Sequence, residues 1–333
     1  MRDRVAVLGG AGFVGCHLAR MLRRRGSDVV LFDRTAPNSM GRHILAAAPP
    51  GVEFVEGDIS VPTELAGLFR HGPFQAVVNL AALQMLAWCN AHPLQTYAVN
   101  VIGPLVLFDL AAQAGVSRVV HVSSTGVLVA VHANVVDERH TTLDIVGGHP
   151  AGHYGSSKAM SEIAALAFAR VQHLDVVVLR FPSVYGFGSP HQTFLAQAVH
   201  AKAAGRPLDA PVGAEDRRDY LYVLDAAEAL VRAIDVPSAR LTQRLFFIAL
   251  GRLHTDRDVA KILNDLKPPS SVRIGSGMSP VEASLDCIRA GYDISAATRD
   301  LQFTPRFTLA LGLMDYLEWA DSYLRSRDTD ARD

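Results

Sequence analysis

The chain contains 333 residues, of which 49% are hydrophobic and 20% charged, and its formal net charge is −1. This composition is typical of a globular protein and excludes a disordered chain, and the near-neutral charge gives no overall attraction to nucleic acid. The length suggests one large domain with an attached lobe, or two domains. We expect no membrane-spanning helix, because no stretch approaches about 20 consecutive apolar residues.

In the first half of the chain, short apolar runs rich in β-branched residues alternate with longer helical patterns. Strands are predicted at residues 5–8, 28–32, 53–56, 76–80, 118–123 and 175–181, and helices at 13–25, 93–114 and 154–172. Such strands, apolar throughout and separated by helices, are typical of a parallel sheet covered on both faces. After Pro182 the pattern loosens, with helices predicted at 192–204, 225–234 and 309–324 and a short strand at 221–223. We therefore expect an α/β fold whose second lobe is assembled from non-contiguous pieces.

The sequence VAVLGGAGFVG, residues 5–15, joins the first strand to the first helix and contains the spacing GxGxxG. Glycines permit a tight turn and let the backbone approach a pyrophosphate, while the helix N-terminus offers unpaired N–H groups to the anion. The motif alone is weak. Here it has its strand before it, its helix after it and an acidic residue, Asp33, at the end of the next strand, so we predict dinucleotide binding.

The acidic residue bears on the choice of dinucleotide. A carboxylate at Asp33 suits the ribose 2′-OH of NAD and repels the 2′-phosphate of NADP, whereas the neighbouring Arg34 would accommodate that phosphate. NAD is the predicted cofactor, and the strictness of the preference stays open. Asp58 follows the third strand at the same edge of the sheet, either near the adenine amino group or as a loop or helix-capping acid.

Three further segments are expected to meet at the carboxyl ends of the strands, where ligands bind in open parallel sheets. They are Ser123-Ser124-Thr125 after the fifth strand, Tyr154 with Lys158, and Asn100 in the preceding long helix. A free tyrosine has a pKa near 10, and a lysine one helical turn away is expected to favour the phenolate. Tyr154 would then transfer a proton and Thr125 would hydrogen-bond the substrate oxygen, with hydride passing to a nicotinamide.

Taken together, these motifs resemble those of the extended short-chain dehydrogenase/reductase family, the NAD-dependent epimerase/dehydratase group. The matching segments are the glycine loop, Asp33, NLAA at 79–82, residues 97–125, the Tyr154 and Lys158 pair, LRFPSVYG at 179–186, RRDYLYVLDAAEAL at 217–230 and residues 292–319. They cover essentially the whole chain in the family's order, which makes the resemblance specific.

The resemblance implies a Rossmann domain at residues 1–182 plus about 220–250, a substrate-binding lobe at 183–219 and about 251–330, and a homodimer packed through two long helices. The implied catalytic residues are Thr125, Tyr154, Lys158 and Asn100. The implied cofactor-binding residues are Gly9, Gly12, Phe13, Val14, Gly15, Asp33, Arg34, Asp58, Ile59, Leu80, Ala81, Ala82, Ser123, Tyr154, Lys158 and Phe181. The implied substrate-binding residues are Gln84, Ser124, Thr125, Ser183 and Arg218.

The resemblance leaves the reaction less constrained than the fold. Family dehydratases carry an Asp-Glu pair directly after the catalytic Thr, whereas Gly126 and Val127 follow Thr125 here, which argues against 4,6-dehydration. We expect epimerisation of a sugar or nucleotide sugar. The alternatives are a net NAD-dependent dehydrogenase or reductase of a small polar hydroxy compound, such as a uronate, aldonate or hydroxy acid, and a protein that senses a dinucleotide without turnover.

Two positions bear on whether the substrate carries a diphosphate. Ser183 stands where sugar-nucleotide members of the family commonly have an asparagine that touches a phosphate. Arg218 stands where such enzymes often place a diphosphate-binding arginine, which favours an anionic substrate. The alternative for Arg218 is an exposed side chain paired with Asp216 or Asp219.

Cysteines and histidines suggest no further chemistry. Cys16, Cys89 and Cys287 are too far apart in sequence for a disulfide framework or a CxxC site, which favours a reducing compartment. The 13 histidines include no HExxH pair, so we expect no metal. The N-terminal residues lack the pattern of a signal peptide. We expect a cytoplasmic protein that binds a small-molecule substrate and neither nucleic acid nor membrane.

Overall fold

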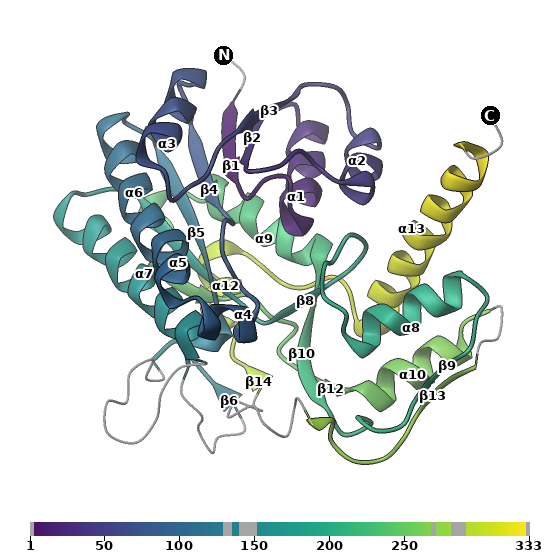
Figure 1. Cartoon of the computed structure of the whole chain (residues 1–333). Helices are drawn as coiled ribbons and strands as arrows, with labels where there is room; N and C mark the ends of the chain where they lie inside the picture. Colours follow the sequence, from purple (N-terminus) through teal and green to yellow (C-terminus); the bar gives the residue numbers. More distant parts are fainter. Residues whose placement is uncertain (1–2, 129–134, 140–151, 268–270, 281–290, 331–333) are drawn as a thin grey trace.

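The computed structural model describes residues 3–128, 135–139, 152–267, 271–280 and 291–330. Its centre is a seven-stranded sheet in the order β3-β2-β1-β4-β5-β7-β11, and every neighbouring pair is parallel (Figure 1). The strands are β1 (Arg4–Leu8), β2 (Asp28–Asp33), β3 (Val52–Glu56), β4 (Ala76–Asn79), β5 (Arg118–Ser124), β7 (Val176–Phe181) and β11 (Leu245–Phe247). The predicted α/β fold is confirmed, and β11 is a strand that the sequence pattern did not reveal.

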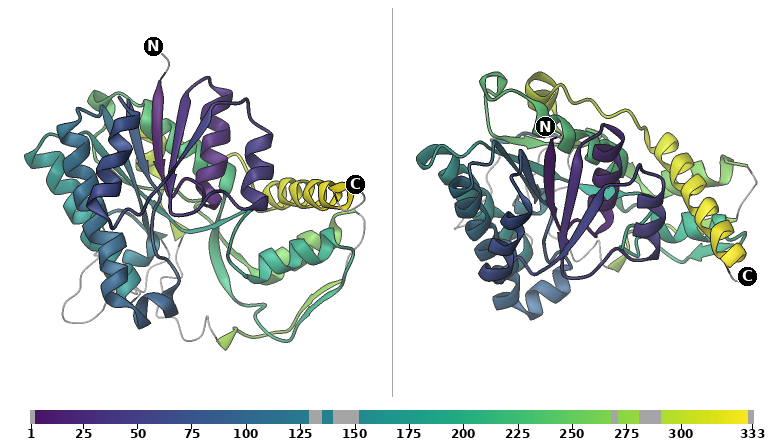
Figure 2. Two further views of the ribbon diagram at one scale, coloured as in Figure 1. Left: turned by 45° about the horizontal axis from the view of Figure 1, so that its top comes forward. Right: turned by 90° about the horizontal axis from the view of Figure 1, so that it is seen from above.

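Helices cover both faces of this sheet (Figures 1 and 2). One face packs against α1 (Phe13–Arg24), α9 (Val223–Asp235) and α12 (Ser295–Leu301), and the other against α3 (Pro62–Leu68), α6 (Gly103–Gln113) and α7 (Gly152–Val171). Within β1, Val5 and Val7 join the first core while Ala6 and Leu8 join the second, because successive side chains of a strand point to opposite faces. Burial on both faces explains why the strands are apolar throughout.

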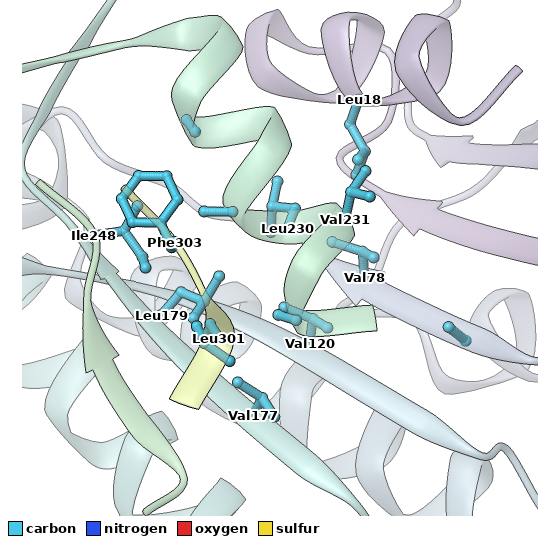
Figure 3. Packing of buried hydrophobic residues seen from close by; sticks show 14 of the residues in the cluster. Leu18, Val78, Val120, Val177, Leu179, Leu230, Val231, Ile248, Leu301 and Phe303 are labelled. Carbon is cyan, nitrogen blue, oxygen red and sulfur yellow. The ribbon is translucent and has the colours of Figure 1, made fainter. Parts of the chain in front are cut away.

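The core beneath α9 includes a contribution from far along the chain. Leu18 of α1 and Leu230 of α9 pack there with Leu179 of the sheet, and Leu301 and Phe303 lie in the same cluster (Figure 3). The last two come from the stretch about 251–330 that was expected to belong to the lobe. Residues 295–303 therefore return to the sheet domain, because their apolar side chains complete its core.

The second lobe is built around a three-stranded sheet in the order β12-β10-β8. Its elements are β8 (Ser183–Tyr185), α8 (Phe194–Ala203), β9 (Leu208–Ala210), β10 (Arg217–Tyr222), β12 (Leu253–Thr255), α10 (Asp256–Asp265), β13 (Val272–Ile274) and α13 (Leu309–Asp330). Leu195, Val199, Leu263 and Leu313 pack in its core. Helix α13 lies on the side of the molecule away from α6 and α7 (Figure 2). Smaller elements are α2 (Ser39–Ala46), α4 (Leu86–Ala91), β6 (Val135–Val136) and β14 (Gly291–Tyr292).

The long helix predicted at 93–114 is interrupted. It consists of α5 (Pro93–Tyr97), a π-helical turn at Ala98–Ile102 and α6. Pro104 accounts for the break, because a proline lacks an N–H donor and its ring crowds the carbonyl four residues earlier, that of Asn100. By length and composition alone, Pro93–Gln113 could cross a membrane, which makes it the exception to the expectation that no segment is sufficiently apolar.

Two of the three cysteines lie in the described part of the chain. Cys16 and Cys89 are free and buried, and Cys287 lies outside the described residues. Within the described ranges, no group of three or more His, Cys, Asp or Glu side chains is arranged to hold a metal ion.

Candidate active site

A cavity of about 890 Å³ opens at the carboxyl ends of the strands of the large sheet and is lined by both lobes. The strand order reverses between β1 and β4, and this is where open parallel sheets bind their ligands. Every predicted cofactor-binding and substrate-binding residue lines the cavity, as do Thr125, Tyr154 and Lys158. Of the predicted site residues, only Asn100 is not part of its wall.

The glycine loop has the geometry needed to hold a pyrophosphate. Gly9 has a φ of +68°, and a Cβ there would lie 2.7 Å from the backbone nitrogen of Ala81. A Cβ on Gly15 would lie 2.5 Å from the carbonyl oxygen of Gly10, so this glycine lets α1 pack closely against the loop. The N-cap of α1, Gly12, supplies no side-chain hydrogen bond, and the first turn has no acidic residue. The N–H groups at the start of α1 are thus suited to an anion.

Asp33 lies at the end of β2 beside this loop. Its carboxylate accepts hydrogen bonds from the N–H groups of Ala11, at 3.1 Å, and Arg34, at 2.8 Å. Burial raises the pKa of this carboxyl group, and the backbone hydrogen bonds oppose that shift. The Arg34 guanidinium lies 3.8 Å from Oδ2 of Asp58, whose Oδ1 accepts from the backbone and hydroxyl of Ser60. Asp58 therefore stabilises its own loop, as expected for a loop acid, and it also lines the cavity where the adenine was expected.

The side chain of Ser124 lies beside the phenol of Tyr154 and lowers its pKa. Ser124 ends β5, and its Oγ accepts a 3.0 Å hydrogen bond from the N–H of Gly126. A Cβ on Gly126 would lie 3.4 Å from the Tyr154 ring, so a glycine here lets the turn lie against the phenol. The prediction gave the hydroxyl role beside Tyr154 to Thr125. Thr125 follows directly as the first residue of the 3₁₀ turn Thr125–Val127 and lines the cavity, so its role stays a prediction.

The acidity of Tyr154 depends on burial as well as on charge. Burial raises the pKa of Tyr154, and the Ser124 side chain opposes this shift, while the expected influence of Lys158 stays a prediction. Burial likewise lowers the pKa of Lys158 to about 8, against the attraction of Glu162. Desolvation is therefore the dominant influence on both groups of the pair.

A chain of buried hydrogen bonds holds the helix that carries Lys158. The Asn79 amide nitrogen lies 3.2 Å from Nδ1 of His121, whose Nε2 lies 3.0 Å from the Ser161 hydroxyl. Ser161 in turn donates to the carbonyl of Lys158 at 2.9 Å. Since the amide nitrogen of Asn79 can only donate, Nδ1 of His121 accepts and Nε2–H donates. Burial and the nearby Lys158 hold the pKa of His121 well below its usual value, in keeping with this neutral form.

Asn100 lies in the π-helical turn behind the cavity. Its side chain bonds both the N–H and the carbonyl of Leu83, at 2.8 and 2.9 Å, and donates to the Ser157 hydroxyl at 3.0 Å. Leu83 belongs to the cavity wall and Ser157 to α7. Asn100 thus joins the loop after β4 to the helix of Tyr154, and its contacts are those of a positioning residue.

Arg218 faces the cavity from β10, but its partner is neither of the predicted acids. Its Nη1 lies 3.6 Å from Oδ2 of Asp256. Asp219 points elsewhere and accepts the N–H groups of Leu250 and Gly251 at 2.8 and 2.9 Å. Asp216 accepts the N–H of Ser279 at 2.8 Å. Asp256 is far along the chain from Arg218 and comes beside it through the pairing of β10 with β12, which sequence spacing does not reveal.

Four other wall residues were not predicted from the sequence. His191 lies in the loop before α8, and Arg217 precedes the arginine that was predicted. Tyr220 and Tyr292 also line the cavity. Tyr220 belongs to the quoted RRDYLYV segment, so the alternation of side chains along a strand would have placed it beside Arg218.

A parallel sheet with this glycine loop and a Tyr-x-x-x-Lys pair beside a serine hydroxyl defines a Rossmann-fold enzyme of the short-chain dehydrogenase/reductase type. The chain belongs to the NAD dependent epimerase/dehydratase family, whose model matches residues 5–249. NAD is accordingly the cofactor, and the glycine loop and Asp33 fit it.

Named relatives agree with this assignment. The chain is 27% identical to UDP-glucuronate 4-epimerase 6 of Arabidopsis thaliana over 96% of its own length and 72% of the relative. It is 30% identical to UDP-glucose 4-epimerase of Mycolicibacterium smegmatis over 69% of this chain and 72% of the relative. Among solved structures, MoeE5 in complex with UDP-glucose and NAD is 26% identical, with a TM-score of 0.78 and coverage of 97% and 100%.

Proposed function

We propose that this protein is a nucleotide-sugar epimerase that acts on a UDP-hexose or a UDP-hexuronate. The observation that carries the proposal is that one cavity holds the glycine loop, the Tyr154 and Ser124 pair, and the Arg218 guanidinium. Its volume of about 890 Å³ is near the upper end of ligand pockets, roughly 300–1,000 Å³, which suits a dinucleotide together with a second ligand. The UDP-sugar 4-epimerases among the relatives support the same substrate class.

In the proposed reaction, Tyr154 takes the proton of a sugar hydroxyl, and the Ser124 hydroxyl hydrogen-bonds the same oxygen. When bound, NAD accepts a hydride from the sugar carbon and later returns it. Lys158 lies one turn from Tyr154 on α7 and supplies the positive charge that favours the phenolate during proton transfer. At the end of the cycle Tyr154 would give the proton back to the same oxygen, so that the hydroxyl re-forms with the opposite configuration at its carbon.

The test is product analysis with the NAD-loaded protein. Incubation with UDP-glucose or UDP-glucuronate should yield the epimer without net NADH, as followed by chromatography of the nucleotide sugars and absorbance at 340 nm. Tyr154→Phe should abolish turnover while retaining NAD. Stoichiometric NADH would instead identify a net dehydrogenase, and bound NAD without turnover of any nucleotide sugar would favour a dinucleotide sensor.

We further propose that the protein is a homodimer and is not a membrane protein. Leu94, Ile102, Met160 and Ile163 are apolar and at least half exposed, at 84%, 50%, 52% and 53%, and all belong to the helical layer of α5 to α7. Leu107 and Phe108 of the same layer are buried against the sheet. A second copy covering the exposed residues would account for the apolar character of Pro93–Gln113. The free, buried Cys16 and Cys89 suit a cytoplasmic location.

A further inference from the structure

Arg218 and Tyr220 lie on the same face of β10, because alternate side chains of a strand point the same way, and both line the cavity. β12 pairs antiparallel with β10, and α10 begins directly after β12 with Asp256. Asp256 is only 3% exposed and does not form part of the cavity wall. The buried Asp256 carboxylate therefore lies next to two side chains that line the cavity.

The hydrogen bonds among these three residues have a defined direction. The Tyr220 hydroxyl donates to Oδ1 of Asp256, and Nη1 of Arg218 donates to the Tyr220 oxygen at 3.4 Å. A phenol has a single proton, so once it is given to Asp256 the oxygen can act only as an acceptor toward Arg218. Burial and the Asp256 carboxylate raise the pKa of Tyr220, so the phenol keeps its proton. The order of donors and acceptors thus runs from arginine to tyrosine to aspartate.

Such an arrangement fixes an arginine before its ligand arrives. A free arginine side chain has many rotamers, and the entropy lost in fixing it weakens binding unless that loss occurs in the unliganded protein. Asp256 also opposes an anionic ligand by its charge. That opposition is reduced because Asp256 lies at the N-terminus of α10, where the helix dipole favours a carboxylate. The Arg218 side chain is 24% exposed, so its ion pair with Asp256 contributes little to the stability of the fold.

We propose that Tyr220 and Asp256 are positioning residues that hold the Arg218 guanidinium toward the diphosphate of the substrate and so set the affinity for nucleotide sugars. This inference rests on the proposed function and adds two determinants of specificity, of which Asp256 lies outside the cavity wall.

The experiment measures UDP binding to the NAD-loaded protein by calorimetry. Wild type, Tyr220→Phe, Asp256→Asn and Arg218→Ala are compared, together with both double variants that include Arg218→Ala. Tyr220→Phe and Asp256→Asn should each raise the Kd for UDP by about tenfold, because Arg218 loses its orientation. In the Arg218→Ala background the same changes should alter the Kd by no more than about twofold, the usual limit of additivity.

A matched control lies on the same helical turn. Asp258 forms a capping box with Thr255 at the start of α10. Asp258→Ala should lower the melting temperature and leave UDP affinity unchanged, which separates weakening of α10 from loss of the arginine's orientation. In steady-state kinetics over a range of UDP-sugar concentrations, Tyr220→Phe should raise KM while leaving kcat within about twofold.

Each other outcome has a clear consequence. Unchanged affinity in both single variants overturns the positioning role. Tighter UDP binding by Asp256→Asn also overturns it, because Asp256 would then compete with the ligand for Arg218. Weakening that persists in the Arg218→Ala background overturns it as well. In these three cases the epimerase function still stands. A wild-type protein that does not bind UDP refutes the nucleotide-sugar function and this inference together.

Discussion

At the scale of single residues, Tyr154 shows that spacing and environment carry different information. Tyr154 and Lys158 were predicted as a pair, and both line the cavity. The spacing predicts a favourable charge from Lys158, but it does not show that burial raises the pKa of Tyr154. Desolvation depends on neighbours from β5 and α4 that no four-residue spacing can reveal. For the same reason the sequence shows a Ser/Thr run near Tyr154 but not which of its hydroxyls meets the substrate.

The two neighbouring hydroxyls make a sharp test. Ser124→Ala removes the hydroxyl beside Tyr154 and should lower kcat about 100-fold, within the usual range for a group that assists proton transfer. Thr125→Val keeps the shape of the side chain and should have a much smaller effect. Steady-state kinetics on UDP-glucose measure both. A larger fall in kcat for Thr125→Val would instead identify Thr125 as the catalytic hydroxyl.

Lys158 predicts how NAD binding depends on pH. Its pKa of about 8 means that the ammonium loses its proton as pH rises past 8, so NAD affinity should fall roughly tenfold between pH 7 and pH 9. The free energy of unfolding should instead rise between about pH 8 and pH 10.5. Over this interval the folded protein has lost the Lys158 proton, whereas the unfolded chain still binds it. Calorimetric titration of NAD at each pH measures the effect.

Lys158→Arg is the control for this pH dependence, because a guanidinium stays protonated throughout the range. Its NAD affinity should be nearly constant from pH 7 to pH 9. A decline equal to that of the wild type would assign the titration to another group.

At the scale of elements, the position of α7 depends on the buried chain Asn79, His121, Ser161 and the Lys158 carbonyl. The strands and α7 were predictable from their apolar periodicity. The polar chain was not, because each of its members reads in sequence as one polar residue in an apolar run. The break before Pro104 was visible in principle, since a proline inside a helical pattern disturbs the hydrogen bonds of the preceding turn.

His121→Phe tests the buried chain. The change leaves the Asn79 amide and the Ser161 hydroxyl without their partner, so the free energy of unfolding should fall by about 2–3 kcal/mol. Urea denaturation measures it. The exposed His92 provides the control, and His92→Phe should change stability by no more than about 0.5 kcal/mol. Equal stabilities for the two variants would show that the chain contributes nothing.

At the scale of the whole molecule, the sheet domain was far more predictable than the lobe. Its strands have four to seven residues and alternate with helices in a regular pattern, except for the three-residue β11 that was missed. In the lobe, β8, β9, β12 and β13 have three residues each, and their pairing depends on segments distant in sequence. Short strands carry too little periodicity to be recognised, and only the tertiary context selects their partners.

The proposed dimer gives a test at this scale. Leu94→Glu with Ile163→Glu places two charges on the exposed apolar layer of α5 to α7 and should convert the dimer to monomers. Light scattering coupled to gel filtration measures the mass. Leu324 is 37% exposed on α13, on the other side of the molecule, so Leu324→Glu should leave the mass unchanged. A monomeric wild type would contradict the proposal.

The return of residues 295–303 to the large sheet has a consequence for how far the molecule can be divided. A fragment ending at residue 249, where the family match stops, would keep the whole glycine loop and every strand of the large sheet. It would lack Ala297, Leu301 and Phe303, so apolar side chains of α9 and β11 would be exposed to water. The sheet domain is therefore incomplete without residues 295–303. A chimera that exchanges the substrate lobe between relatives must also include a segment that completes this core.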